Sequence, residues 1–352
     1  MENLIFCINP GSTSTRVALF KGTEEVFKKN IAHSIDELEK FSSIHDQHSI
    51  RLEYILQTLS DHGYRPTDLS IVIGRGGMMP PLKAGGYIVN DEMLKLLIED
   101  KIPQHASNLG CILAHEVAEL GGIDAYIYDA VSVDEFPEIA KITGIPEIKR
   151  QSFCHVLNSK AVARIYAESI GKKYEEVNLV VAHLGGGISI SSHVNGKIVD
   201  SQSDDAGPFA PERAGSIPSV YVIELCFSGQ FDQRQMKKKF RGQGGLRALL
   251  GTSDCIEIEK RIKNGDEYAK LVYDAMAYQI AKGICLSFAP LMGEIDAVIL
   301  TGSLSYSEYI VEKVKSYIHS FAPVIVIPGE NEMDALAAGG LRILQGEKTH
   351  AL

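Results

Sequence analysis

Features that mark several classes of protein are scarce in this sequence. The six cysteines are scattered, with no C-x-x-C pair and no His/Cys cluster, which argues against a disulfide framework and a zinc site. Acidic residues outnumber basic ones, and the formal net charge of -10 argues against general nucleic-acid binding. No apolar run approaches the roughly 20 residues of a membrane span, and the first residues carry no basic segment typical of an export signal. We therefore expect a cytoplasmic protein that binds neither membranes nor nucleic acid.

What the sequence does contain is one pattern that occurs twice. In the first copy an apolar run enters a glycine turn at Gly11, continues as a strand rich in hydroxyl residues, and reverses at Gly22. In the second copy an apolar run leads to Gly185–Gly187, and the chain reverses at Gly196. Internal similarity at matched spacing indicates two related units. Two domains of ordinary size also suit a chain of 352 residues with 45% hydrophobic residues.

Each copy of the pattern offers groups that bind anions. A glycine turn flanked by hydroxyls presents backbone N–H groups and O–H donors to a phosphate. No Gly-Lys-Ser/Thr sequence is present, so neither turn is a P-loop. Two such turns predict one nucleotide held between two units, whereas two unrelated hairpins would be the simpler alternative.

Several other short apolar runs end in residues that suit a ligand site. The run Ile71–Ile73 leads to Arg75 between glycines, a second run ends on Asp129, and a third opens into Gly302. Ligands of open α/β sheets bind beyond the carboxyl ends of the strands. As alternatives, Arg75 would be a solvated turn residue and Asp129 a simple turn former.

The middle of the second half is predicted to be a functional loop. Ser201 to Pro218 shows no helical or strand pattern, and long loops inside compact domains are usually functional. This loop presents a single arginine, Arg213, although it could also be a lid or a dimer contact. Further along, the lysines 237–239 are predicted to lie on a solvated face, and Leu246–Asp254 is predicted to be a turn.

Taken together, these stretches resemble the acetate/butyrate kinase family, in the superfamily of acetate kinases, sugar kinases, heat-shock chaperones and actin. The matching stretches are Asn9-x-Gly11-Ser12-Thr13-Ser14-x-Arg16, Gly74–Gly77, His105–Leu109, Tyr128-Asp129, His183–Gly187, Gly207–Phe209 with Pro211–Gly215, and Pro328–Glu332. They occur in the expected order and span nearly the whole chain.

The resemblance implies a fold and an activity. It implies an α/β protein with two duplicated ribonuclease-H-like (actin-like ATPase) domains and a nucleotide cleft between them. We expect residues 1–148 with 333–352 to form the first domain and 149–332 the second. The implied activity is reversible phosphoryl transfer between ATP and a short-chain carboxylate, giving ADP, with Mg²⁺ as cofactor. The partners are these small molecules, and a homodimer or higher homo-oligomer is expected.

The resemblance also implies roles for individual residues. The nucleotide and its phosphates would be bound by Asn9, Gly11, Ser12, Ser14, Arg16, His183, Gly185, Gly186, Gly187 and Gly302. The catalytic positions would be Arg213, Asp129, Arg75 and His155. Either Arg75 or His105 would hold the substrate carboxylate. Glu332 matches the metal-side glutamate better than Glu330, and Asn9 would be its partner at the metal.

Some positions depart from the pattern of acetate kinases. Those enzymes carry Arg-Val-Val-His-Gly-Gly where this chain has Val72–Gly77, so Arg75 takes the place of the histidine. Arg16 stands where many relatives have lysine, and the usual Gly-Ile-Gly-Glu-Asn run is missing after Gly302. These departures favour butyrate over acetate. Because one methylene discriminates by only about 1–3 kcal/mol, acetate, propionate and a branched-chain acid stay open, as does an actin-like or chaperone-like ATPase.

Overall fold

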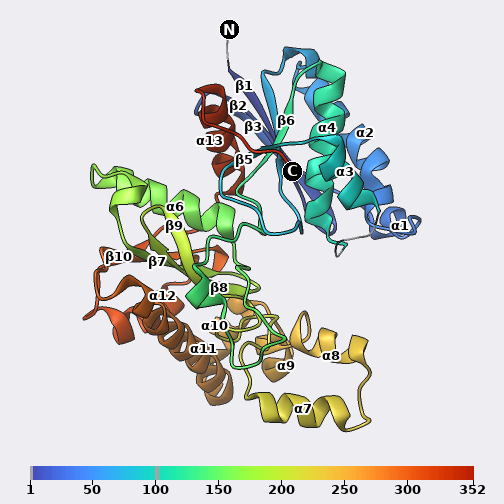
Figure 1. Cartoon of the computed structure of the whole chain (residues 1–352). Helices are drawn as coiled ribbons and strands as arrows, with labels where there is room; N and C mark the ends of the chain where they lie inside the picture. Colours follow the sequence, from blue (N-terminus) through green and yellow to red (C-terminus); the bar gives the residue numbers. More distant parts are fainter. Residues whose placement is uncertain (1–2, 100–101, 103) are drawn as a thin grey trace. The chain divides into compact units, whose positions relative to one another are not determined.

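The computed structural model describes residues 3–99, 102 and 104–352, and the chain divides into two compact units. Unit 1 comprises Met1–Asp134 with Asn331–Leu352, and unit 2 comprises Glu135–Glu330 (Figure 1). The division falls earlier than the expected boundary at 148/149. The reason is that Glu135 already belongs to unit 2, where its carboxylate lies 2.7 Å from Lys160 Nζ and accepts a bond from the Ile198 N–H.

Unit 1 is built on a mixed sheet of six strands. In chain order they are β1 (Leu4–Pro10), β2 (Ser14–Lys21), β3 (Glu24–Ala32), β4 (Ile71–Arg75), β5 (Gly86–Ile88) and β6 (Ala125–Tyr128). The sheet order is β3-β2-β1-β4-β6-β5. The first three strands form an antiparallel meander, β1, β4 and β6 are parallel, and β5 closes one edge antiparallel to β6.

Helices cover both faces of this sheet (Figure 1). The helices of unit 1 are α1 (Ile35–Leu38), α2 (His48–Asp61), α3 (Asp91–Ile98), α4 (Leu109–Gly121) and α13 (Glu332–Leu344). Neighbouring residues of β4 show that α4 and α13 lie on opposite faces, since side chains alternate along a strand. A methyl group added at Gly74 would contact Gly110 of α4. A methyl group added at Gly340 of α13 would contact the side chain of Ile73, the neighbour of Gly74 in β4.

Unit 2 repeats the strand order of unit 1. Its strands are β7 (Leu179–Leu184), β8 (Ile188–Val194), β9 (Lys197–Gln202), β10 (Ala297–Thr301) and β11 (Val324–Val326). The sheet order, β9-β8-β7-β10-β11, corresponds to β3-β2-β1-β4-β6. Both meanders reverse at a glycine with positive φ, Gly22 and Gly196, and both carry a register shift shortly before that turn. The predicted duplication is therefore present in the folded chain.

The helices of unit 2 form a layer on each face of the sheet. They are α5 (Glu138–Lys141), α6 (Val156–Ser169), α7 (Ser219–Phe227), α8 (Gln233–Phe240), α9 (Gly245–Leu250), α10 (Cys255–Lys263), α11 (Glu267–Leu286) and α12 (Glu308–Ile318). Leu179 and Val181 pack with α6, whereas Val180 and Ala182 pack with the core formed by α11 and α12. The stretch predicted as a turn, Leu246–Asp254, begins with α9, because Leu246 and Leu250 are drawn into that core.

Each sheet is covered by a helix that follows the strands of the other unit in the chain. Helix α6 follows the strands of unit 1 in sequence but packs on β7 and β10 of unit 2. Helix α13 follows β11 of unit 2 but packs on β1 and β4 of unit 1. The sheet of unit 1 therefore needs a helix from beyond the segment of unit 2, which makes the last helix part of the first unit.

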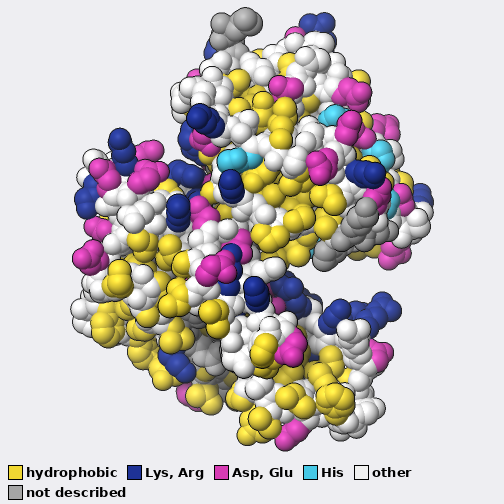
Figure 2. Space-filling view, viewed as in Figure 1, with side chains coloured by type: hydrophobic (Ala, Val, Ile, Leu, Met, Phe, Trp, Pro, Cys, Tyr) yellow, Lys and Arg dark blue, Asp and Glu magenta, His cyan; other side chains and the backbone are white. Residues whose placement is uncertain are grey.

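The surface of unit 2 carries a basic cluster over α8, seen in Figure 2 as a group of dark-blue side chains. Lys237, Lys238 and Lys239 are all exposed, which confirms the predicted solvated face. Across residues 3–99, 102 and 104–352, no helix is both long and apolar enough to cross a membrane.

Candidate active site

In unit 1 the predicted site residues lie at one edge of the sheet. Asn9, Arg75 and Asp129 stand at or just beyond the carboxyl ends of β1, β4 and β6, which are neighbouring parallel strands. The sheet register pairs Ile8 with Gly74 and Arg75 with Tyr128, so these ends are level. This edge is where ligands bind in open α/β sheets.

Three of these side chains form one hydrogen-bonded triad. Asn9 Nδ2 donates to Glu332 Oε2 at 2.6 Å. Arg75 Nη1 donates to Asn9 Oδ1 and to Glu332 Oε2, each at 3.2 Å, while Arg75 Nη2 lies 3.1 Å from Glu332 Oε1. Asn9 and Glu332 are buried, and Arg75 is partly exposed. The triad fixes the direction of Arg75 at the strand edge.

The triad does not form a ready magnesium site. Magnesium takes oxygen ligands, commonly one or two carboxylates together with substrate phosphates. Glu332 is the one carboxylate here, and the guanidinium of Arg75 approaches both of its oxygens. In the described part of the chain, no group of three His, Cys, Asp or Glu side chains could hold a metal ion. Asn9 and Glu332 thus lie next to each other, but the guanidinium of Arg75 already contacts the oxygens of both side chains. They therefore do not fit a preformed metal site.

The first glycine turn lies beside this triad and rests on a buried arginine. Arg51, from α2, donates to the carbonyls of Gly11 and Ser12 at 2.9 and 3.0 Å, and to the Ser14 carbonyl at 3.1 Å. The Gly11 N–H also donates to the Ser14 carbonyl at 2.7 Å. Ser12 is exposed and Ser14 partly exposed, whereas Arg16 projects from β2 as an exposed side chain.

Two further predicted residues of unit 1 have structural roles of their own. Asp129 adopts a positive φ of 42° and exchanges two hydrogen bonds with Gly85, one through its side chain at 2.9 Å and one through its backbone at 3.2 Å. His105 is exposed and precedes the short 3₁₀ turn Ala106–Asn108, accepting a bond from the Ser107 N–H at 3.2 Å. The chain after Arg75 packs on this turn, where the Met78 N–H donates to Asn108 Oδ1.

In unit 2 the second glycine turn lies beside a pair of stacked histidines. The rings of His155 and His183 are 3.8 Å apart and nearly parallel. Asn158 Nδ2 lies 2.9 Å from His183 Nδ1, and Ser189 Oγ lies 2.7 Å from His155 Nδ1. His183 is the last residue but one of β7, as Asn9 is of β1, and both precede their glycine by two residues in the repeat. The structure therefore joins His155 to the second glycine turn.

Gly302 packs closely against the start of the second glycine turn. Its backbone exchanges two hydrogen bonds with Gly329, at 3.0 and 3.1 Å, and it has a φ of +87°. A methyl group at this position would lie 2.3 Å from the Leu184 carbonyl oxygen. Only glycine permits both that φ and that close approach.

Arg213 is held at the second turn by an aspartate. Arg213 Nε donates to Asp204 Oδ2 at 2.9 Å, and Arg241 Nη2 donates to Asp204 Oδ1 at 2.5 Å. Asp204 lies over Gly187, where a methyl group would come within 3.1 Å of its Cβ. The neighbouring Glu212 reaches the turn through its backbone N–H, which donates to the Gly186 carbonyl. The long loop thus carries its arginine to the glycine turn, where an anion would bind.

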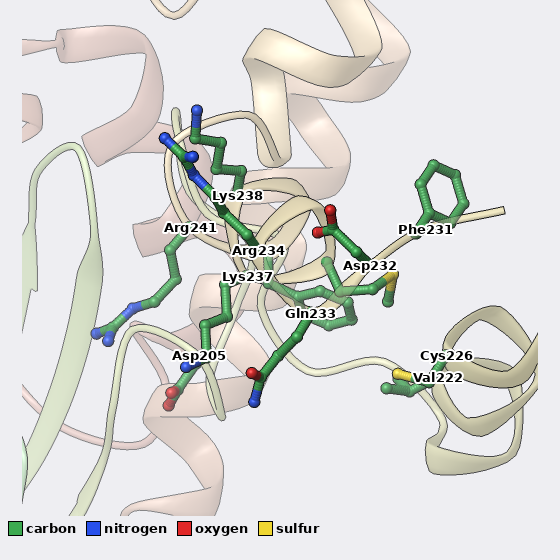
Figure 3. A pocket seen from close by; sticks show the side chains of 12 residues that line it. Asp205, Val222, Cys226, Phe231, Asp232, Gln233, Arg234, Lys237, Lys238 and Arg241 are labelled. Carbon is green, nitrogen blue, oxygen red and sulfur yellow. The ribbon is translucent and has the colours of Figure 1, made fainter. Parts of the chain in front are cut away.

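Two of the hollows in unit 2 are lined in part by the long loop, and one of these two includes predicted site residues. A hollow of about 290 Å³ is lined by Gly185, Gly186, Glu212 and Ser303, among others. A larger one, of about 1190 Å³, lies between α7 and α8 and is shown in Figure 3. Its lining includes Asp205 and Arg241 but no glycine of either turn. Its size therefore does not make it the catalytic site, and the smaller hollow is the one that borders the second glycine turn.

Sequence reasoning missed the residues that hold the site together, above all Arg51 and Asp204. A signal for Arg51 exists: it occupies the buried stripe of α2 with Ile55 and Leu59, four and eight residues later, where an apolar residue is expected. Asp204 gives no such signal, because it is one of two adjacent aspartates in an irregular loop.

Fold and site together define a class of protein. Two units with one strand order, each ending its first strand in a glycine turn, form the duplicated ribonuclease-H-like fold of the actin-like ATPases, which confirms the predicted α/β fold class. Residues 142–333, more than half of the chain, match the acetokinase family. The chain therefore belongs to the acetokinase family, a family of ATP-using kinases that phosphorylate carboxylates.

Solved structures of similar fold agree with this assignment. The acetate kinase of Porphyromonas gingivalis is 21% identical, with a TM-score of 0.79 over 97% of this chain and 100% of that one. An acetate kinase from Entamoeba histolytica is 17% identical, with a TM-score of 0.76 over 96% and 98% of the two chains. A propionate kinase from Francisella tularensis subsp. tularensis SCHU S4 is also 17% identical, with a TM-score of 0.74 over 96% and 98%.

Proposed function

We propose that the protein is a butyrate kinase that transfers phosphoryl groups reversibly between ATP and butyrate, giving ADP and butyryl phosphate. The observation that carries the proposal is the pair of glycine turns at equivalent places of two repeated units, one beside Arg75 and the other beside Arg213. We infer that each turn binds phosphate groups of the nucleotide. The alternative within the family is another short or branched-chain acid.

The chemistry requires alignment and charge neutralisation rather than a general base. A carboxylate is already ionised at pH 7, so the difficulty lies in bringing two anions together. Phosphoryl transfer is accelerated chiefly by positioning and by stabilising the charge of the transferred group. We infer that Arg213, oriented by Asp204, stabilises the transferred phosphoryl group. We further infer that Asp129 helps either to orient Arg213 or to hold a metal. His155 and His183 would complete the second phosphate turn.

The substrate carboxylate is proposed to bind near the edge of the first sheet. Arg75 is the better candidate because Glu332 and Asn9 hold its guanidinium in place, and His105 is the alternative. A planar guanidinium matches the two oxygens of a carboxylate. An apolar pocket would receive the acyl chain. The magnesium ion expected from the resemblance stays a prediction.

The setting of the reaction is also a proposal. Acyl phosphates are strong phosphoryl donors, so we expect the enzyme to form ATP during fermentation in the cytoplasm. A homodimer or higher homo-oligomer is expected, and helix α7 suits such a contact because none of its residues is buried and Phe227 is 86% exposed. Light scattering after gel filtration would measure the mass of the assembly.

The central experiment is a trap for acyl phosphate. The purified chain is incubated with ATP, magnesium, hydroxylamine and one acid at a time, from two to six carbons, and the hydroxamate is measured. Butyrate should give the highest kcat/KM. A maximum at another acid would replace butyrate within the family, and ATP hydrolysis without hydroxamate from any acid would favour an actin-like or chaperone-like ATPase. A preparation carrying Arg213→Lys serves as the control for contaminating kinases.

A further inference from the structure

Arg51 is a charged side chain with no exposed surface, placed directly beneath the first glycine turn. Its solvent exposure is 0%. Nη1 donates to the carbonyls of Gly11 and Ser14 and to Thr15 Oγ1, and Nη2 donates to the Ser12 carbonyl and to Gln47 Oε1. Arginine is almost never fully buried unless it is paired with a carboxylate. This burial therefore calls for an explanation.

No carboxylate pairs with Arg51 in the part of the chain that the structure describes. All its partners are neutral carbonyl, amide or hydroxyl oxygens, and burial lowers the pKa of its guanidinium to about 10. His33, bonded to the same Thr15 hydroxyl at 2.8 Å, has a pKa lowered to about 4, first by burial and then by the charge of Arg51. A buried cation without a counter-ion is unfavourable, so an anion bound across the turn would relieve it.

The hydrogen bonds of Arg51 also decide which way the turn faces. The carbonyls of Gly11, Ser12 and Ser14 point inward to the guanidinium, and the Thr13 carbonyl accepts from the His33 N–H at 2.9 Å. The N–H groups of Ser12 and Thr13 have no acceptor among the described residues, and both residues are exposed. With its carbonyls held from below, the turn presents N–H donors outward, as an anion site needs.

We propose that Arg51 is a positioning residue for ATP: it holds the Gly11–Ser14 turn with its N–H groups outward and supplies positive charge behind it for the phosphates. This inference rests on the proposed function, in which the turn binds the phosphates of ATP. Arg51 touches no substrate and acts only through the turn.

The test compares three variants by ATP binding and by kinetics. Arg51→Met removes the donors and keeps much of the volume, Arg51→Lys keeps the charge with fewer donors, and Ile55→Ala opens a cavity one turn further along α2 without touching the glycine turn. Titration calorimetry measures the Kd for ATP and for AMP, and the hydroxamate assay gives KM for ATP and for the acid. Amide hydrogen exchange reports on Ser12 and Thr13.

We expect Arg51→Met to raise Kd and KM for ATP about tenfold or more, because the turn loses the donors that hold its carbonyls and the positive charge behind it. KM for the acid should stay within about twofold and Arg51→Lys should be intermediate, because charge survives but the planar fork does not. Ile55→Ala should lower thermal stability without changing either KM, since its cavity is remote from the turn.

The outcomes separate this inference from the proposed function. If every Arg51 variant loses only thermal stability, as Ile55→Ala does, the positioning role is wrong. Should Arg51→Met fail to fold, Arg51→Lys decides the question through its Kd for ATP and the exchange rates of Ser12 and Thr13. If the unaltered chain binds ATP but forms no acyl phosphate, the proposed function fails, and the Kd values still test Arg51.

Discussion

Replacing Gly302 by alanine tests whether the second glycine turn is fixed by a close backbone approach. Gly302 has a φ of +87°, and its backbone is held by two hydrogen bonds to Gly329. The new methyl group would lie 2.3 Å from the Leu184 carbonyl oxygen and 2.8 Å from the Leu184 nitrogen and carbonyl carbon. Leu184 is the residue before Gly185, so the substitution presses directly on the start of the turn.

The magnitude follows from two separate contributions. With its ψ of 175°, Gly302 lies in a backbone region that is used almost only by glycine and costs an L-residue about 1–3 kcal/mol. Relief of the overlap requires β7 and the end of β10 to move apart, and overpacking of this kind costs about 1–3 kcal/mol more. Gly302→Ala should therefore destabilise the protein by about 2–6 kcal/mol and raise KM for ATP about tenfold, because movement of the turn misplaces donors that need close geometry.

Gly265→Ala is a matched control. Gly265 follows α10 with a φ of +89°, nearly the value of Gly302, but nothing lies within 4 Å of the position of its methyl group. It should therefore show the cost of a positive φ alone, about 1–2 kcal/mol, and an unchanged KM for ATP. Urea denaturation gives the difference in free energy of unfolding, and the hydroxamate assay gives KM. Equal effects of the two substitutions on both quantities would refute the account of Gly302.

Three further predictions concern charge. Arg213→Lys should lose most of kcat, on the order of 10³-fold, because lysine lacks the planar fork. As a control, Arg234→Lys on exposed α8 should not change the rate of hydroxamate formation. A normal rate for Arg213→Lys would remove Arg213 from the mechanism. Asp204→Asn should lower kcat about tenfold by loosening Arg213, a difference of about 1.4 kcal/mol, and an unaltered kcat would show that Arg213 needs no such partner. Burial and then the charges of Lys160 and Arg164 lower the pKa of His193 from 6.5 to about 3, so its stabilising contribution is complete above pH 6.5 and decreases as the pH falls toward 3, by about 1.4 kcal/mol per pH unit. In thermal denaturation, the loss of stability between pH 7.5 and pH 5.5 should be smaller for His193→Gln than for the unaltered chain. An equal loss in the two proteins would contradict this account.

Much of the fold could be predicted from the sequence because it depends on local pattern. Apolar runs bounded by glycines mark the strands, and the repeated spacing of Gly11 to Gly22 and Gly185 to Gly196 marks the duplicated meander. The stretch Leu246–Asp254 shows where this fails: its first residues form a short helix because the core of unit 2 buries Leu246 and Leu250.

The candidate site, like the fold, could be predicted from the sequence only in part. By itself the sequence determined where the glycine turns and the strand ends would be, and which side chains, such as Arg75 and Arg213, follow them, because these depend on chain neighbours. Only the tertiary structure decided what holds those groups. Arg51 reaches its turn from a helix about 40 residues further along, and Glu332 reaches Arg75 from the last helix, 257 residues away. Such partners are chosen by packing, since a buried charge or carbonyl must find a partner wherever the fold brings one near.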